Sequence, residues 1–310
     1  MKIAFMFSGQ GSQYAGMGRE LYENFECAKE VYDTADEALG FKISEIILNG
    51  GEQLDKTEFT QPAILTMSTA ALRALEEKGI KAEYAAGLSL GEYSAYVAAG
   101  AFDFKDAVGL VRKRGRFMTE AVPEGVGAMY AVMGLERDIV EKTCDEITAK
   151  GGFVSPANYN APGQIVVAGY AEDAREAAER LKECGAKLTV KLNVSGPFHT
   201  ALLKPASDKL AAELENIDIH NMNIPVLTNV TGDVVDDESL IKPYLIKQVM
   251  SPVKWEDTIK KLYEKGVDTF IEIGPGKALN GFVKRTLKGV KILNVEDMKS
   301  LEKTLASLEV

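Results

Sequence analysis

The sequence predicts an α/β protein in which a parallel β-sheet wrapped by helices is interrupted once by a smaller domain. Short apolar runs that end in turns alternate with stretches of helical periodicity over most of the chain. One internal stretch, residues 125–194, follows a different order of elements. The 310 residues correspond to two domains at ~150 residues each.

The first part of the chain predicts strands and helices in alternation. Ile3–Phe7 is an apolar run followed by Gly9 and Gly11, which is typical of a buried parallel strand that feeds a turn. Apolar residues recur every three or four positions over Gln61–Lys78, and Gly79 ends this helix. The same patterns predict a strand at 84–88 and helices at 92–99 and 104–122.

Residues 125–194 predict the order β-α-β-β-α-β. The expected strands are 128–133, 153–158, 165–168 and 188–192, and the expected helices are 137–150 and 171–184. This order is that of the ferredoxin-like, split-βαβ unit. We therefore expect a large domain of residues 1–124 and 195–310 and an inserted ferredoxin-like domain of residues 125–194.

The α/β alternation returns after the insert. It predicts helices at 200–214, 240–249, 255–265 and 278–287, and strands at 226–230, 269–273 and 290–295.

Composition excludes several classes of protein. The net charge is −10, which argues against a nucleic-acid binder that relies on phosphate attraction. Three separated cysteines, Cys27, Cys144 and Cys184, and two histidines predict neither a disulfide framework nor a metal site. The first apolar run is too short for a signal peptide, and no run of about 18 apolar residues occurs. We expect a cytoplasmic protein without a membrane segment.

Gly87-Leu88-Ser89-Leu90-Gly91 matches the G-x-S-x-G pattern of a nucleophile elbow. It follows an expected strand and precedes a helix of small residues, which is the context that such an elbow needs. The helix N-terminus would aim backbone N–H groups at a carbonyl under attack. An N-capping serine in a Gly-rich turn is the alternative; the context favours Ser89 as a nucleophile.

A serine nucleophile needs a base, and His199 is the better of the two histidines. His199 lies in a Gly-Pro loop where the insert returns the chain to the large domain, and clefts form at such junctions. His220 lies in a polar connection before Pro225 and reads as an exposed loop residue. A helix-start histidine with a structural hydrogen bond is the alternative for His199.

Gln10 and Arg114 are further candidates. The loop Gly9-Gln10-Gly11 lacks the third glycine of a dinucleotide fingerprint, because Tyr14 occupies that position, and it lacks a phosphate-loop lysine. Gln10 is better placed to lend a backbone N–H to an oxyanion. Helical phase puts Arg114 on an apolar helix face, where it needs an anion, either an internal carboxylate or a ligand.

Together these residues resemble the malonyl-CoA:acyl carrier protein transacylases, and more broadly the acyltransferase domains of fatty-acid and polyketide synthesis. The resemblance covers nearly the whole chain and rests on several motifs in order. They are FSGQGSQ at 7–13, GLSLGE at 87–92, Arg114-Gly115, NYNAPGQ at 158–164, Pro197-Phe198-His199, QVMSPVKW at 248–255 and EIGPG at 272–276.

The resemblance implies a hydrolase-like large domain with a ferredoxin-like insert, and it implies roles for the motif residues. Ser89 would be the nucleophile and His199 its base, oriented by the backbone carbonyl of Gln248. The backbone N–H groups of Gln10 and Leu90 would form the oxyanion hole.

Three more residues have expected places in the substrate pocket. Arg114 would bind the free malonyl carboxylate, and Asn160 and Phe198 would line the pocket. Leu88 stands where the family often has histidine, and since leucine cannot act as a base, this departure affects only the pocket lining.

The implied reaction transfers malonyl from malonyl-CoA, through a malonyl-serine, to the phosphopantetheine thiol of holo acyl carrier protein. It needs no metal and no permanently bound cofactor, and it would supply fatty-acid synthesis; a polyketide acyltransferase is an alternative. The family's carrier protein is acidic, so a basic patch is expected, either at Lys284, Arg285 and Lys288 or at Lys187 and Lys191. A merely solvated helix or strand face is the interpretation that the sequence favours for either group.

Two other functions stay open at this point. A serine thioesterase or esterase would use the same elbow with water as acceptor and an acid such as Asp173 between Ser89 and His199. A non-catalytic module that docks a carrier protein would need neither Ser89 nor His199.

Overall fold

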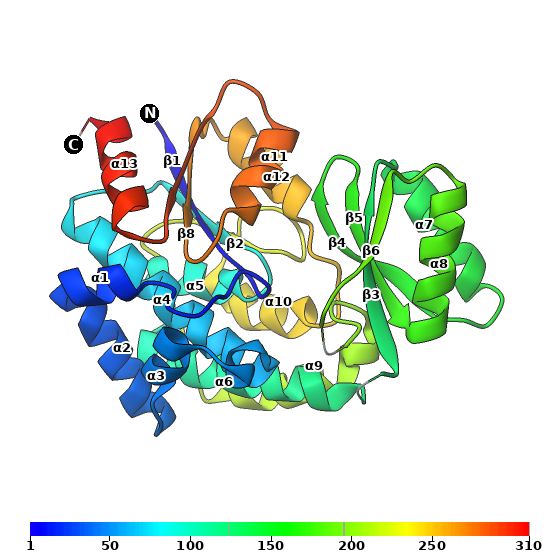
Figure 1. Ribbon diagram of the computed structural model, residues 1–310, viewed down its shortest axis with the longest axis horizontal. Coiled ribbons are helices and arrows are strands. Elements are labelled where there is room, and N and C mark those ends of the chain that lie inside the picture. The colour runs from blue at the N-terminus through cyan, green and yellow to red at the C-terminus, as the bar shows by residue number, and fades with distance from the viewer. Residues whose placement is uncertain (124, 195, 310) are drawn as a thin grey trace.

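The computed structural model describes residues 1–123, 125–194 and 196–309, and it contains two β-sheets with helices packed around them. Residues 124, 195 and 310 lie outside the described part, so the predicted domain limits at these positions fall outside it. The parallel sheet and most helices form one body, and the second sheet with its two helices lies beside it (Figure 1).

The first sheet has five parallel strands in the order β7-β2-β1-β8-β9. They are β1 (Ile3–Phe7), β2 (Tyr84–Gly87), β7 (Val226–Leu227), β8 (Thr269–Ile273) and β9 (Lys291–Val295). Phe7 pairs with Gly87 on one side and with Ile273 on the other. The loops after β1, β2 and β8 therefore leave the sheet at the same edge, where ligands bind in open α/β sheets.

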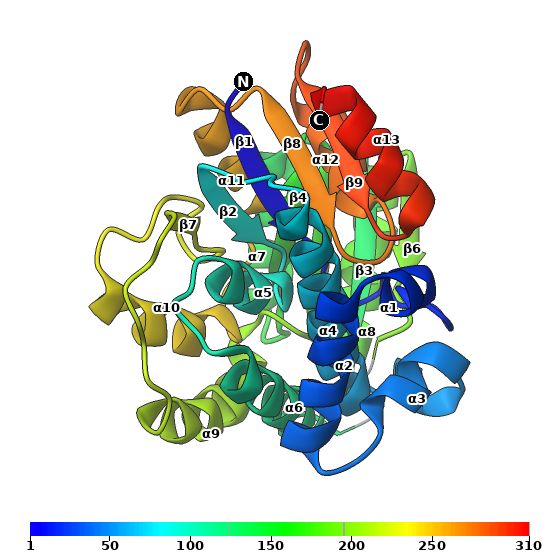
Figure 2. The same cartoon turned by 90° about the vertical axis from the view of Figure 1, so that its left-hand side faces the viewer.

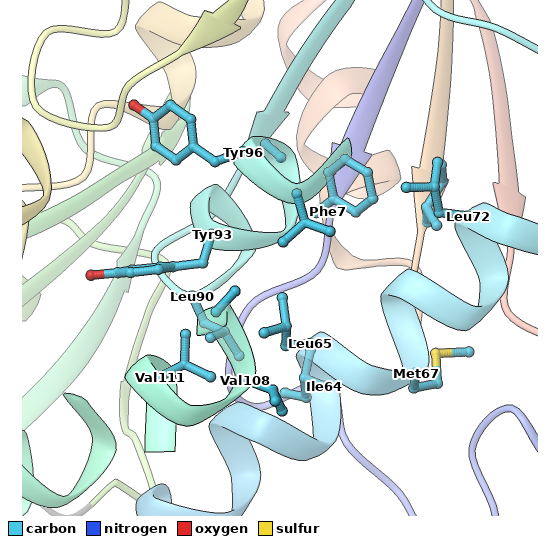
Figure 3. Close-up of a cluster of buried hydrophobic side chains, with 14 of the residues drawn as sticks. Phe7, Ile64, Leu65, Met67, Leu72, Leu90, Tyr93, Tyr96, Val108 and Val111 are labelled. Carbon is cyan, nitrogen blue, oxygen red and sulfur yellow. The ribbon is translucent and has the colours of Figure 1, made fainter. Parts of the chain in front are cut away.

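Both faces of this sheet are covered. Successive side chains of β1 alternate between two buried clusters: Phe5 and Phe7 join one, Ala4 and Met6 the other. A parallel strand buried on both faces is apolar throughout, which explains the run Ile3–Phe7. Figure 3 shows side chains of the first cluster, among them Phe7, Leu65 and Leu90.

Most helices surround the parallel sheet. They are α1 (Arg19–Asn24), α2 (Glu26–Leu39), α3 (Ile43–Asn49), α4 (Thr57–Glu77), α5 (Gly91–Ala98), α6 (Phe104–Ala121), α9 (Lys204–Glu215), α10 (Ile241–Gln248), α11 (Trp255–Glu264), α12 (Ala278–Thr286) and α13 (Met298–Leu308), with short 3-10 turns at Glu52–Asp55, Ala201–Leu203 and Glu238–Leu240. Figure 2 shows α13 beside β9 and α4 beside α2.

The second sheet has four antiparallel strands in the order β4-β5-β3-β6. They are β3 (Gly127–Met133), β4 (Val154–Ala161), β5 (Gln164–Tyr170) and β6 (Leu188–Lys191), with α7 (Arg137–Thr148) after β3 and α8 (Ala171–Glu183) after β5. The predicted β-α-β-β-α-β order of elements is present. This sheet and its helices bury a separate core around Val140, Val167 and Leu181.

Backbone hydrogen bonds and ion pairs join the antiparallel sheet and its helices to the parallel-sheet body. The N–H of Tyr159 in β4 donates to the carbonyl of Val253 at 2.8 Å, and the N–H of Val253 donates to Ala157 at 2.9 Å. Arg137 of α7 contacts Glu256 and Asp257 of α11 at 3.1 and 2.8 Å. These contacts fix the antiparallel sheet against the edge at which the parallel strands end.

Four predicted boundaries are wrong by three residues or more. The strand expected over 153–158 continues as β4 to Ala161. The helix expected from residue 200 starts as a 3-10 turn and becomes α-helical only at Lys204, because Pro205 suits a first helical turn and lacks the N–H of an interior one. The strand expected over 226–230 ends at Leu227, since the N–H of Thr228 bonds the Asp233 carbonyl across a turn. Helix α4 starts at Thr57 and continues through Pro62.

Candidate active site

Ser89 sits in the turn between β2 and α5 with a left-handed backbone, φ 54°. The turn is tight on both sides. A Cβ on Gly87 would lie 2.0 Å from the carbonyl carbon of Gly91, and one on Gly91 would lie 2.1 Å from the Phe7 oxygen. Only glycine fits at either position, which is the physical reason for the G-x-S-x-G spacing.

The Ser89 hydroxyl lies 2.8 Å from Nε2 of His199, and Nδ1 of His199 lies 2.9 Å from the backbone oxygen of Gln248. A carbonyl can only accept, so Nδ1 carries the proton and Nε2 is left as an acceptor for the hydroxyl. Burial, with a further contribution from the Arg114 charge, lowers the pKa of His199 to about 4. The imidazole is therefore neutral at pH 7 and able to take a proton.

Arg114 lies beside the serine. Its Nη2 donates to Ser89 Oγ at 3.2 Å and to Gln248 Oε1 at 3.0 Å, and its Nη1 donates to Gln61 Oε1 at 2.7 Å. The guanidinium carbon is 5.3 Å from the centre of the Tyr93 ring. The predicted burial of Arg114 on the apolar face of α6 is confirmed, since its relative exposure is 1%.

Within residues 1–123, 125–194 and 196–309, no carboxylate forms an ion pair with Arg114. The internal carboxylate that the sequence left open as a partner is thus absent from the described structure. A guanidinium keeps its positive charge in proteins, so Arg114 places a positive charge without an ion-pair partner in the described structure next to the serine.

Two buried residues that the sequence analysis did not single out hold the turn. Asn229 Oδ1 accepts from the Ser89 N–H at 2.6 Å, and Asn229 Nδ2 donates to the Gly87 carbonyl at 2.7 Å. Glu92 accepts from the Asn229 N–H at 2.9 Å and from Gln248 Nε2 at 2.8 Å. Burial raises the pKa of Glu92. Asn229 and Glu92 thus join the serine turn to the segment that orients His199.

A cavity of about 230 Å³ opens at this cluster. Its lining includes Ser89, His199 and the loop 8–12 from the parallel-sheet body, and Met129, Asn158, Asn160, Val166, Leu192 and Val194 from the antiparallel-sheet segment. Helix α12 adds Ala278, Leu279 and Phe282. The lining is mostly apolar, with a few polar groups converging on the serine, which is the pattern of a ligand site.

The remaining predicted residues fall in or near this cavity. Gln10, Leu88, Asn160 and Phe198 line it, and the Asn160 side-chain oxygen is buried without a partner among the described residues. Leu90 is buried at the start of α5, directly after Ser89.

The other histidine, His220, and the acid proposed for an esterase, Asp173, do not line this cavity. His220 is 51% exposed and faces Asp103 at 3.4 Å. Asp173 accepts from the Phe153 N–H at 2.7 Å within the second sheet's body, and the His199 Nδ1 that it would orient bonds Gln248 instead.

The described residues hold no group of three or more His, Cys, Asp or Glu side chains placed to bind a metal ion. None of the helices in the described chain is both long enough and apolar enough to cross a membrane.

Comparison with known proteins gives one consistent result. Residues 4–304 match the acyl transferase domain model. The malonyl CoA-acyl carrier protein transacylase of Bacillus subtilis is 50% identical over 99% of this chain and 98% of its own, and that of Escherichia coli K12 is 44% identical over 92% of each.

Two solved structures have the same overall fold. A malonyl CoA-acyl carrier protein transacylase from Clostridium perfringens superposes with a TM-score of 0.96, at 50% identity, over 100% of this chain and 98% of its own. A malonyl-transacylase solved in complex with a type II polyketide acyl carrier protein has a TM-score of 0.96 at 42% identity, over 99% of this chain and 100% of that one.

Proposed function

The chain belongs to the acyl transferase domain family, and from this membership and the geometry of the site we propose that it transfers malonyl from malonyl-CoA to holo acyl carrier protein. One observation carries the proposal. Arg114, a buried cation with no ion pair among the described residues, lies 3.2 Å from the hydroxyl of a serine that is hydrogen-bonded to a neutral histidine. Such a cation has no role in a general esterase, whose substrates carry no charge on the acyl group. In an enzyme whose acyl group has a free carboxylate, the cation can bind that carboxylate.

In the first half-reaction Ser89 Oγ attacks the thioester carbonyl of malonyl-CoA, and His199 Nε2 takes the hydroxyl proton. The C–S bond then breaks, the imidazolium returns the proton to sulfur, and CoA leaves as a thiol. A malonyl-serine ester remains. The Gln248 carbonyl stabilises the imidazolium through Nδ1–H, the role that a carboxylate has in a hydrolase triad.

The oxyanion formed during attack would be held by the backbone N–H groups of Gln10 and Leu90. Leu90 follows Ser89 directly, at the N-terminus of α5, and Gln10, in the loop after β1, lines the same cavity as Ser89. Neither N–H donates a hydrogen bond to another described residue. The positive end of the α5 dipole adds to the stabilisation.

In the second half-reaction the phosphopantetheine thiol of the carrier protein replaces CoA in the cavity. It gives its proton to His199 and takes the malonyl group, and the serine hydroxyl recovers the proton. Malonyl-CoA is the substrate, and the residues need no cofactor for this chemistry. Asn160 and Phe198 would line the channel that both pantetheine arms enter.

Arg114 would bind the malonyl carboxylate. Its planar guanidinium can donate two parallel hydrogen bonds to a carboxylate, and the site offers the incoming group no competing ion pair. This role explains why a buried cation is kept next to Ser89, whose side chain lines the mostly apolar cavity.

At the level of the fold, we infer a hydrolase-like large domain of residues 1–124 and 195–310 whose β2–Ser89–α5 turn is a nucleophile elbow. The strand order β4-β5-β3-β6 supports a ferredoxin-like insert of residues 125–194. We also propose a cytoplasmic location and a supply of malonyl groups to fatty-acid synthesis.

Intact mass measurement tests the function. Incubation with malonyl-CoA should add one malonyl group to the protein, and Ser89→Ala should abolish the adduct. Addition of holo acyl carrier protein should move the group to the carrier. An undiminished adduct in Ser89→Ala would contradict the nucleophile, and release of free malonate in place of malonyl carrier would identify a thioesterase.

A further inference from the structure

Arg114 is held in the buried site by uncharged oxygen atoms. Its nitrogens donate to the amide oxygens of Gln61 and Gln248 and to the Ser89 hydroxyl. Buried arginines are usually paired with carboxylates, because an isolated buried charge is costly. The two amides accept hydrogen bonds from Nη1 and Nη2 and fix the position of Arg114, but they do not neutralise its charge. The Nε of Arg114 is buried without a hydrogen-bond partner among the described residues.

Both the side chain and the backbone of Gln248 bond other residues of the site. Its side-chain Nε2 donates to Glu92 and to the Ser89 carbonyl, and its backbone oxygen orients His199. Gln248 therefore also stands between Arg114 and the buried carboxyl of Glu92. A substitution at this position would change the base, the serine turn and the arginine together, so it cannot isolate the effect on Arg114.

Gln61 acts on Arg114 alone. It is 1% exposed in the second turn of α4, and its Oε1 accepts the shortest of the Arg114 hydrogen bonds. Its Nε2 faces only the sulfur of Met118, a weak acceptor, at 3.5 Å. Burial of an amide with one poorly satisfied end costs free energy, which leaves the contact with Arg114 as its structural purpose.

We propose that Gln61 is a specificity-determining residue: its neutral amide oxygen positions Arg114 and leaves the arginine's charge unpaired for the carboxylate of the incoming acyl group. This inference rests on the proposed function. A glutamate of the same shape at this position would form a charge-assisted pair with Arg114, and both side chains would be buried. The acyl carboxylate would then meet a neutralised arginine and a second anion.

The test compares Gln61→Glu, Gln61→Met and wild type with malonyl-CoA and acetyl-CoA, and free pantetheine as acceptor. In Gln61→Glu, kcat/KM for malonyl-CoA should fall at least about 10-fold relative to that for acetyl-CoA, the factor that corresponds to one hydrogen bond to a charged group. Gln61→Met leaves Arg114 charged but less well held, so it should raise KM for malonyl-CoA several-fold and change acetyl transfer little. Gln53→Glu, at an exposed glutamine of the Glu52–Asp55 turn, adds the same charge elsewhere and should match wild type.

The pH profile of acylation by acetyl-CoA supplies a second readout. The Arg114 charge contributes to the low pKa of His199, so pairing Arg114 with a glutamate should raise that pKa and move the acidic limb to higher pH. A merely structural defect would lower kcat/KM equally for malonyl-CoA and acetyl-CoA, and it would leave the acidic limb of the pH profile in place.

Each outcome supports or overturns the role of Gln61 in the preference for malonyl-CoA. An unchanged malonyl preference in Gln61→Glu, or equal losses in Gln61→Glu and Gln61→Met, overturns the inference. If Gln61→Glu does not fold, an unchanged KM for malonyl-CoA in Gln61→Met overturns it. Absence of any malonyl adduct in wild type would instead refute the proposed function, which the same measurements distinguish.

Discussion

Ser89 and His199 both adopt a left-handed backbone, with φ of 54° and 61°. Such conformations cost about 1–3 kcal/mol for a residue with a side chain and persist only where neighbours enforce them. At Ser89 the neighbour is Asn229, which bonds the Ser89 N–H and the Gly87 carbonyl. At His199 it is the Gln248 carbonyl. The strain places the two reacting atoms 2.8 Å apart before any substrate binds.

The low pKa of His199, about 4, leads to a prediction for the pH dependence. A base works only when deprotonated, so acylation should stay nearly constant from pH 7 to about pH 5 and fall as the pH approaches 4. Initial CoA release measured between pH 4 and 8 checks this, with circular dichroism to follow folding. A midpoint near 6.5 would show that the histidine is not in its buried, neutral environment during reaction.

His199→Ala gives the companion prediction. Loss of a general base should slow acylation by about 10²- to 10⁴-fold and remove the acidic limb, while the fold is kept. His220→Ala, which alters an exposed histidine, is the matched control and should react like wild type.

Arg114→Ala should lower kcat/KM for malonyl-CoA by roughly 10- to 150-fold, if hydrogen bonds to the carboxylate contribute about 1.5–3 kcal/mol. Because the acetyl group of acetyl-CoA has no carboxylate, kcat/KM for acetyl-CoA should fall little. Arg114→Lys keeps the charge but not the planar fork, and should restore malonyl transfer only in part. The malonyl-to-acetyl ratio of kcat/KM is the measurement, and an equal fall for both substrates would make Arg114 a structural cation.

The sequence was sufficient to single out Ser89, His199 and Arg114 as candidates, because each breaks a local rule. Ser89 has a glycine two positions away on either side, His199 is one of only two histidines in the sequence, and Arg114 is a cation on an apolar helix face. Asn229 and Gln61 give weaker signals. Asn229 follows a strand that ends earlier than its apolar run suggests. Gln61 is a polar residue before a helix proline, a position where a boundary is the ordinary expectation. Their partners are 140 and 53 residues away, a distance that no local pattern reveals.

Among the elements, the turn from β2 to α5 depends strongly on residue size. Gly91→Ala should destabilise the protein by about 1–3 kcal/mol, because its Cβ would lie 2.1 Å from the Phe7 oxygen, a backbone atom that cannot move alone. The same shift should displace Ser89 and slow acylation. Thermal unfolding and the rate of adduct formation measure the two effects.

Gly109→Ala is the control for this substitution. Gly109 lies inside α6, and an added Cβ there meets no atom within 4 Å. Alanine favours helix by about 1 kcal/mol over glycine, so this variant should be as stable as wild type or more so. A Gly91→Ala protein as stable as Gly109→Ala would mean that the turn tolerates a side chain.

At the scale of the whole molecule, the cavity needs both bodies, since residues of the antiparallel sheet face Ser89 across it. The order of elements in each body could be predicted from periodicity. Their relative placement could not, because it depends on contacts such as Tyr159 with Val253 and Arg137 with Asp257, which join residues 94 and 120 positions apart.

Helix α12 connects the cavity to the outer surface. Ala278, Leu279 and Phe282 line the cavity, and Lys284 and Arg285 are exposed one turn further along the same helix. Neither cation forms an ion pair with a described residue. Lys187 and Lys191, the other predicted basic group, are exposed on or next to the edge strand β6. The link to the cavity favours α12 as the place where an acidic carrier protein docks while its arm reaches Ser89.

Reversal of both charges, Lys284→Glu with Arg285→Glu, should therefore weaken transfer to carrier protein. Exposed ion pairs contribute about 0.2–1 kcal/mol each, so kcat/KM for the carrier should fall roughly 2- to 30-fold. Transfer to free pantetheine, which has no acidic surface, should not change. Added salt should slow wild-type transfer to the carrier and affect the variant less, because salt screens exposed charges. The matched variant Lys187→Glu with Lys191→Glu should behave like wild type; if it shows the larger loss, docking takes place at the β6 edge instead of α12.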